Sequence, residues 1–128
     1  MSSERALVMG IVAGEASGEN LAVDLVDMIA LQTGSQPKLV GVGGDRLRKR
    51  GLESVFDASE IALTGLTSVI ASLPRLVLRI DQTARALAAA RPDVVIFIDS
   101  PDFSHRVARR VKRALPDVPI FKYVAPSV

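Results

Sequence analysis

Apolar residues follow two alternating patterns along the chain: short continuous runs, and longer stretches in which they recur every three or four positions. The first run, residues 6–12, shows no polar alternation, as expected of a strand covered on both faces. Helical spacing then extends from Glu19 to near Gly34, which predicts the first helix. Residues 38–42 form a second run and predict a second strand, which ends at Gly43-Gly44.

The same alternation continues through the second half of the chain. A basic helical turn at residues 46–50 and a third strand at residues 53–56 precede a long helical region. Residues 93–98 (DVVIFI) are continuous and rich in β-branched side chains, so they predict a buried strand. A helix is expected to start at Ser100-Pro101, because its apolar residues repeat every four positions. A last strand is predicted at residues 120–124.

This order of elements predicts an α/β fold. Strands that alternate with helical crossovers form a mostly parallel, doubly wound, Rossmann-like sheet with helices on both faces. The chain contains no internal repeat or flexible linker, so residues 1–128 are expected to form one domain.

Composition narrows the possible chemistry. The 128 residues are 48% apolar, enough for a hydrophobic core, and contain no cysteine, which excludes disulfides and thiolate metal sites. His105 is the single histidine and is expected at the surface, so neither a metal nor another cofactor is expected. The N-terminal apolar run is too short for a secretory signal, which favours a cytoplasmic protein.

Charge is distributed unevenly along the chain. Residues 1–64 contain six basic and nine acidic residues, whereas residues 65–128 contain ten basic and five acidic ones. This asymmetry favours an anionic partner for the second half. Aromatic residues make up only 4% of the chain, which argues against a nucleic-acid platform. Five cations lie on the helix after Pro101, where a solvated helix face is the ordinary explanation: Arg106, Arg109, Arg110, Lys112 and Arg113.

The first candidate loop, residues 13–18 (AGEASG), lies between the first strand and the first helix. Ligands of open parallel sheets bind beyond the carboxyl ends of the strands, and Gly14 and Gly18 permit close approach to the backbone. The spacing matches neither a dinucleotide fingerprint nor a triphosphate loop. Alternatively, the glycines only form the turn and Ser17 only caps the helix.

The second candidate loop begins at Asp99, directly after the DVVIFI strand. A carboxylate at that position faces the crevice and is the first candidate for a general base. Glu15, from the neighbouring loop, is a second carboxylate that could share the crevice. Alternatively, Asp99 or Ser100 caps the next helix while Asp102 interacts with the positive end of its dipole.

The third feature is the uncharged segment 61–74, which is followed by Arg75 and Arg79. It is too short to span a bilayer, but an apolar helical face that ends in arginines suits a membrane interface. Core packing would produce a similar stripe. Pro74 is expected to kink or divide the region. The apolar residues at helical spacing are Leu66, Val69, Ile70 and Leu73.

Several motifs together resemble the lipid-A-disaccharide synthase family. They are VAGEASGENL, VGVGG, ALTGLTSV, RPDVVIFIDSPDF and KYVAPSV, and they cover nearly the whole chain in the family's order and spacing. In the third motif the family commonly has a Met-Gly pair and a nearby glutamate, where this chain has Thr64-Gly65 and Ser68.

The resemblance implies an inverting glycosyltransferase of the GT-B architecture from Gram-negative lipopolysaccharide synthesis. Such enzymes transfer 2,3-diacylglucosamine from its UDP carrier to 2,3-diacylglucosamine 1-phosphate without a metal, at the inner-membrane surface. Residues 1–128 would be the N-terminal acceptor-side domain, and the UDP-binding C-terminal domain would be absent.

The motifs also imply roles for individual residues. Asp99 matches the general base of the IDxPDF motif. Glu15 and Ser17 match the loop expected to orient the acceptor sugar, and the substrate-binding set is completed by Gly14, Gly18 and Asp102. The competing hypothesis is a stand-alone Rossmann-like module that binds a phosphorylated small molecule without catalysis.

Overall fold

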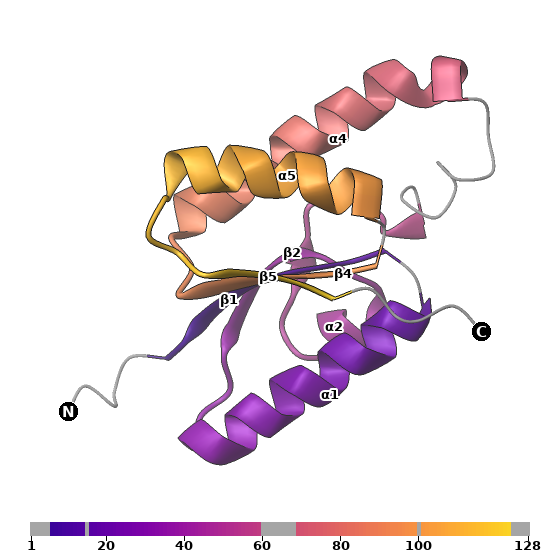
Figure 1. The fold of residues 1–128 in the computed structure, drawn as a ribbon. Helices are drawn as coiled ribbons and strands as arrows, with labels where there is room; N and C mark the ends of the chain where they lie inside the picture. Colours follow the sequence, from indigo (N-terminus) through magenta and orange to yellow (C-terminus); the bar gives the residue numbers. More distant parts are fainter. Residues whose placement is uncertain (1–5, 15, 60–68, 100, 124–128) are drawn as a thin grey trace.

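Five parallel strands form one sheet with the order β3-β2-β1-β4-β5 (Figure 1). The computed structural model describes residues 6–14, 16–59, 69–99 and 101–123, with the side chains of these ranges except those of 16, 69–73 and 101. In chain order the elements are β1 (Val8–Ala13), α1 (Ala16–Thr33), β2 (Lys38–Val42), α2 (Asp45–Arg48), β3 (Glu53–Ser54), α4 (Val69–Ala90), β4 (Val94–Ile98), α5 (Pro101–Ala114) and β5 (Ile120–Tyr123).

Helices cover both faces of the sheet, α1 and α2 on one side and α4 and α5 on the other (Figure 1). The crossovers change sides between the central neighbours β1 and β4, and this position is the topological switch point of a doubly wound sheet. The predicted α/β, Rossmann-like, parallel architecture is therefore confirmed.

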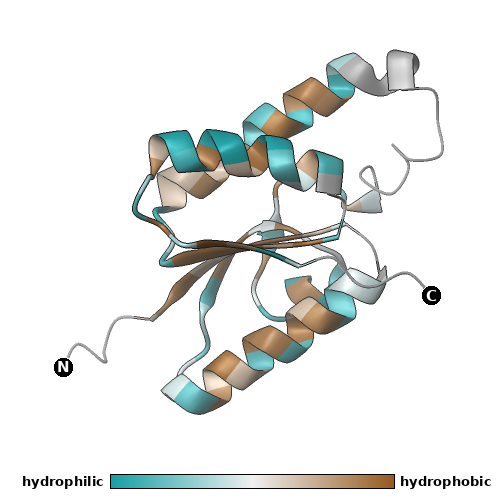
Figure 2. Ribbon diagram, viewed as in Figure 1, coloured by the Kyte–Doolittle hydropathy of each residue, from teal (hydrophilic) through white to brown (hydrophobic). Residues whose placement is uncertain are grey.

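The two cores explain why the strands lack polar alternation. Met9, Ile11 and Ala13 of β1 pack with α1, whereas Val12 of the same strand packs in the core beneath α4 and α5. Successive side chains of a strand point to opposite faces, so a strand buried on both faces has no solvent-facing position. Figure 2 shows the resulting hydrophobic sheet between helices of mixed polarity.

Most predicted boundaries differ from the observed ones by one to three residues, and three departures from the predictions affect the interpretation. Helix α1 begins at Ala16 rather than Glu19, so Ser17 lies inside the helix and is not its N-cap. Strand β3 is limited to Glu53–Ser54, although residues 53–56 were expected. Helix α4 continues on both sides of Pro74, so the proline does not divide it. Pro74 lies near the helix start and removes only one hydrogen bond, which the later turns compensate.

Polar contacts attach α2 and β1 to their neighbours. The Arg50 guanidinium binds Asp27 of α1 at 2.7 and 2.9 Å, and this hydrogen bond lowers the pKa of the Asp27 carboxyl. Between the neighbouring strands β1 and β4, Asp93 donates its backbone N–H to the Val8 carbonyl at 2.7 Å. The Asp93 carboxylate in turn accepts the Val8 N–H at 2.8 Å. These contacts fix the N-terminal ends of β1 and β4 beside each other.

Candidate functional site

The two candidate loops leave neighbouring strands at the same edge of the sheet. Ala13, at the end of β1, pairs with Ile98, at the end of β4. A Cβ atom placed on Gly18 would lie 3.1 Å from Asp99 Oδ2 and 3.0 Å from Ile98 Cγ2, so the Asp99 carboxylate lies directly against the first turns of α1. The prediction that these loops meet along one rim is confirmed.

The backbone of Asp99 is fixed on both sides. Its N–H donates to the Tyr123 carbonyl at 2.7 Å, and its carbonyl accepts the Ser104 hydroxyl at 3.0 Å. Asp99 has a φ of 55°, in the left-handed region that aspartate tolerates better than most residues. This conformation ends the strand abruptly. The carboxylate is thereby held half-buried against Gly18.

Aromatic packing holds the start of α5 in place. The rings of Phe56 and Phe103 meet edge to face with centroids 5.9 Å apart, and the Arg79 guanidinium lies 5.1 Å from the Phe56 centroid. Edge-to-face pairs and cations above ring faces are both favourable arrangements. Asp102 lies in the first turn of α5 and is exposed, so it points to solvent beside the rim.

A hollow of about 340 Å³ opens beside this rim, next to the end of β1. Its lining comes from the ends of β1, from the start of α1, and from the segments that follow β2 and β3. The lining residues are Ala13, Gly14, Glu19, Gly44, Asp45, Arg48, Asp57, Ala58 and Ser59. Gly14 therefore occupies the position expected of it, at the mouth of a cavity.

The described lining of this hollow includes three carboxylates, Glu19, Asp45 and Asp57, and none of them was predicted from the sequence. Glu19 accepts the backbone N–H of Leu47 at 3.0 Å, and a Cβ on Gly44 would approach its Oε1 to 2.7 Å. Asp57 accepts the Ser59 N–H at 3.0 Å, and this hydrogen bond lowers the pKa of the Asp57 carboxyl, as does the nearby charge of Arg48. Asp57 follows the end of β3, so the strand-end argument used for Asp99 could have found it.

The remaining predicted residues are only partly described. Ser17 is exposed at the start of α1, whereas Glu15 and Leu66 lie outside the described residues. The backbones of Val69, Ile70 and Leu73 form the first turns of α4, but their side chains are not described.

The arrangement suits a hydroxyl-bearing ligand better than a metal. Carboxylate oxygens at the rim can accept hydrogen bonds from hydroxyl groups, and one of them can remove a hydroxyl proton. Within the described ranges, no three histidine, aspartate or glutamate side chains are grouped to hold a metal ion. The described helices likewise include none that is long and apolar enough to cross a membrane.

Comparison with known proteins identifies the protein family to which this chain is similar. Residues 9–128 match the family model described as lipid-A-disaccharide synthetase. The chain is 44% identical over 118 residues to the lipid-A-disaccharide synthase of Nitrobacter winogradskyi and 40% identical over 120 residues to that of Myxococcus xanthus; each alignment covers 92% of this chain. It is 37% identical to the Rhodopseudomonas palustris protein over 127 residues, 99% of this chain. These alignments span only 30 to 32% of the relatives' length.

Proposed function

The chain belongs to the lipid-A-disaccharide synthase family, and we propose that it forms the acceptor-side part of an inverting glycosyltransferase of lipid A biosynthesis. The whole enzyme would transfer 2,3-diacylglucosamine from UDP to 2,3-diacylglucosamine 1-phosphate, with the UDP sugar held by a second domain. One observation carries the proposal: the Asp99 carboxylate lies against the Gly18 turn at the switch point of the sheet.

In the proposed reaction, Asp99 acts as the general base. It accepts the proton of the acceptor's 6-hydroxyl group while that oxygen forms a bond to the anomeric carbon of the donor sugar. The bond between the anomeric carbon and the UDP oxygen breaks on the opposite face, and UDP leaves with the electron pair. The β-1,6-linked disaccharide is the product. The hydroxyl proton ends on the Asp99 carboxylate, and we propose that the reaction needs no metal ion, as the family resemblance implies.

The residues around Asp99 would position the acceptor sugar. Gly14 and Gly18 let the sugar approach the backbone, while Glu15, Ser17 and Asp102 supply hydrogen-bonding groups around it. Glu19 and Asp57 add carboxylates on the far wall of the hollow. Correct positioning of a reacting hydroxyl contributes as much to the rate as proton transfer does.

The direct test is an assay of disaccharide formation by the full-length protein that contains this chain. We expect it to convert both diacylated substrates into UDP and the disaccharide, with full activity in the presence of a metal chelator. Residues 1–128 alone are expected to show no turnover, because the UDP sugar would lack its binding domain. Disaccharide formation by residues 1–128 alone would contradict the division of roles between the domains.

We also propose that the segment 61–74 contacts the inner-membrane surface and the acyl chains of the substrates. Immediately after this segment, α4 exposes Val77 and Leu78, which are 49% and 51% accessible, beside the exposed Arg75. Exposed apolar side chains next to cations are typical of interfacial helices. The protein would then be cytoplasmic and peripherally bound to the membrane.

Val69→Asp and Leu73→Asp are expected to weaken binding of the full-length protein to anionic vesicles by about tenfold or more each. Each change removes an apolar side chain from the lipid, at a cost of about 1.5–3 kcal/mol. Vesicle co-sedimentation measures this effect. Leu31→Asp is the matched control, because Leu31 is 84% exposed on α1, across the sheet. Loss of folding in the two α4 variants would instead identify these side chains as core.

A further inference from the structure

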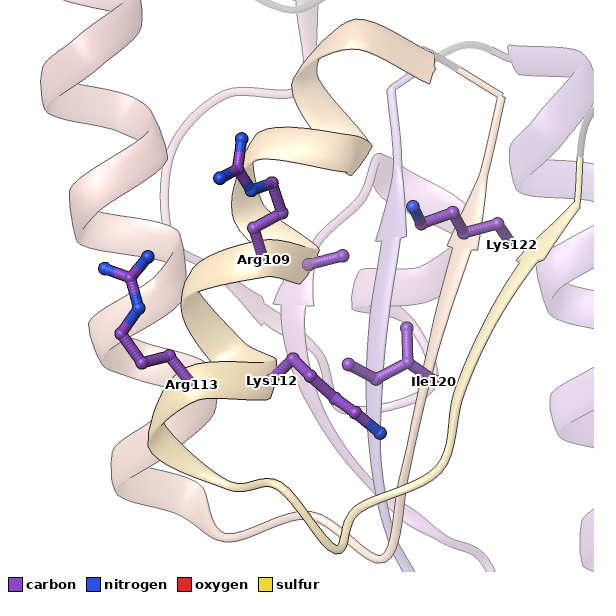
Figure 3. A pocket seen from close by; sticks show the side chains of 6 residues that line it. Arg109, Lys112, Arg113, Ile120 and Lys122 are labelled. Atoms are coloured by element: carbon purple, nitrogen blue, oxygen red, sulfur yellow. The ribbon is translucent and has the colours of Figure 1, made fainter.

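A groove of about 610 Å³ lies between α5 and the strand β5, and its walls are strongly basic. Ala108 of α5 and Ile120 of β5 supply its apolar part, and the four other lining residues are cations: Arg109, Lys112, Arg113 and Lys122. Figure 3 shows Lys112 extending from α5 toward Ile120, and Lys122 extending from β5 toward the helix. Two separate elements therefore direct positive charge into one groove.

The ion pairs of the described residues leave these four cations without a carboxylate partner. Asp81 of α4 forms ion pairs with Arg85 at 2.8 Å and Arg110 at 3.8 Å, and neither arginine lines the groove. Lys122 Nζ lies 3.2 Å from His105 Nδ1, and an imidazole carries no negative charge that could pair with the lysine. Like charges that line one groove repel one another, and an anion in the groove would relieve that repulsion.

The helix dipole accounts for only part of the cluster. Lys112 and Arg113 lie in the last turn of α5, where cations stabilise a helix. Lys122 belongs to a neighbouring strand, however, and Arg109 lies a full turn earlier on the helix. Neither position is required by the dipole, so the presence of four cations along one groove needs another explanation.

The groove shares no lining residue with the hollow beside the Asp99 rim. Asp99 precedes the first turn of α5, whereas Arg109 and Arg113 lie about 12 and 18 Å further along the helix axis from Pro101, at 1.5 Å per residue. Lys122, however, pairs with Phe97, two residues before Asp99, whereas Ile120 pairs with Val95, so the groove extends along β5 from near the rim toward the N-terminal ends of the strands. A ligand bound against Arg113 and Ile120 would lie away from Asp99.

We propose that this groove binds a phosphate group of an anionic ligand, independently of the proposed transferase reaction. Arginine presents a planar fork of N–H donors that matches phosphate oxygens, and lysines add compact charges around it. Ala108 and Ile120 provide an apolar surface for the part of the ligand next to the phosphate. That phosphate belongs either to a lipid headgroup or to a soluble phosphate ester.

The test compares two triple variants of the full-length protein with the same change in charge. The groove variant carries Arg109→Gln, Lys112→Gln and Lys122→Gln. The control variant carries Lys38→Gln, Lys49→Gln and Arg106→Gln, which alter exposed cations outside the groove lining. Binding is measured to vesicles of equal parts phosphatidylglycerol and phosphatidylcholine, and to inorganic phosphate through the width of its ³¹P NMR line.

At low ionic strength, the groove variant is expected to bind the ligand about a hundredfold more weakly than the unchanged protein, or roughly fivefold for each cation removed. The control variant should retain most binding. Loss of vesicle binding alone identifies a lipid headgroup, and loss of ³¹P broadening alone identifies a soluble phosphate. Equal losses in both variants, or no response to either probe in the unchanged protein, would overturn the proposal.

Discussion

Replacing Asp99 with asparagine is expected to lower the turnover of the full-length protein by about 10²- to 10⁴-fold, the usual contribution of a general base. Asparagine has nearly the same shape, but its amide cannot accept the proton of the acceptor hydroxyl. It also tolerates the left-handed backbone conformation that Asp99 adopts, with its φ of 55°. The fold and its stability should therefore be retained, and the loss should appear in kcat rather than in KM.

Steady-state kinetics and circular dichroism of the same preparations measure this effect. Asp117→Asn is the matched control, because Asp117 is exposed in the turn between α5 and β5, away from the rim. Its activity should equal that of the unchanged protein. Near-normal turnover in Asp99→Asn would remove Asp99 from the role of base, whatever happened to substrate binding.

Gly41→Ala is expected to cause the largest loss of stability of any conservative change in the sheet. Gly41 lies within β2 at a φ of 138°, and an added Cβ would meet the backbone oxygen of Ile11 in β1 at 2.0 Å. Both atoms belong to paired central strands, so the contact can be relieved only by separating the strands. We expect a loss of about 4 kcal/mol or more, within the range that unfolds many domains.

Urea unfolding followed by circular dichroism tests this expectation. The variant Gly34→Ala separates the cost of a positive φ from the cost of the steric clash between β1 and β2. Gly34 also has a positive φ, of 80°, but no atom lies within 4 Å of the position of its Cβ. The backbone conformation alone should cost Gly34→Ala about 1–2 kcal/mol. If both variants lost equal stability, the close approach of β1 and β2 would not be the reason for glycine at position 41.

Strand ends were the most informative part of the sequence. Continuous apolar runs identified β1 and β4, because strands buried on both faces carry no polar residues. The rule that ligands bind beyond the carboxyl ends of parallel strands then selects Gly14 and Asp99 from the sequence alone. Asp57 follows a two-residue strand, whose weak pattern did not mark its own end clearly.

Helix boundaries were predicted less well, because the preferences of single residues competed with the contacts of the folded protein. Ser17 is a residue typical of N-caps, yet α1 begins at Ala16 and includes Ser17 in its first turn. Pro74 is a typical helix breaker, yet α4 continues past it. In both places the surrounding structure outweighed the preference of one residue.

By itself the sequence determined the layered α/β architecture and the two loops that carry the candidate chemistry, because burial and turn formation are encoded by residues close together in the chain. Only the tertiary structure decided which distant groups meet: Asp99 with Gly18, Glu19 with the Leu47 amide, and Lys122 with His105 of α5. Those contacts depend on strand order and on which face each helix covers. Local patterns of apolar and polar residues do not contain that information.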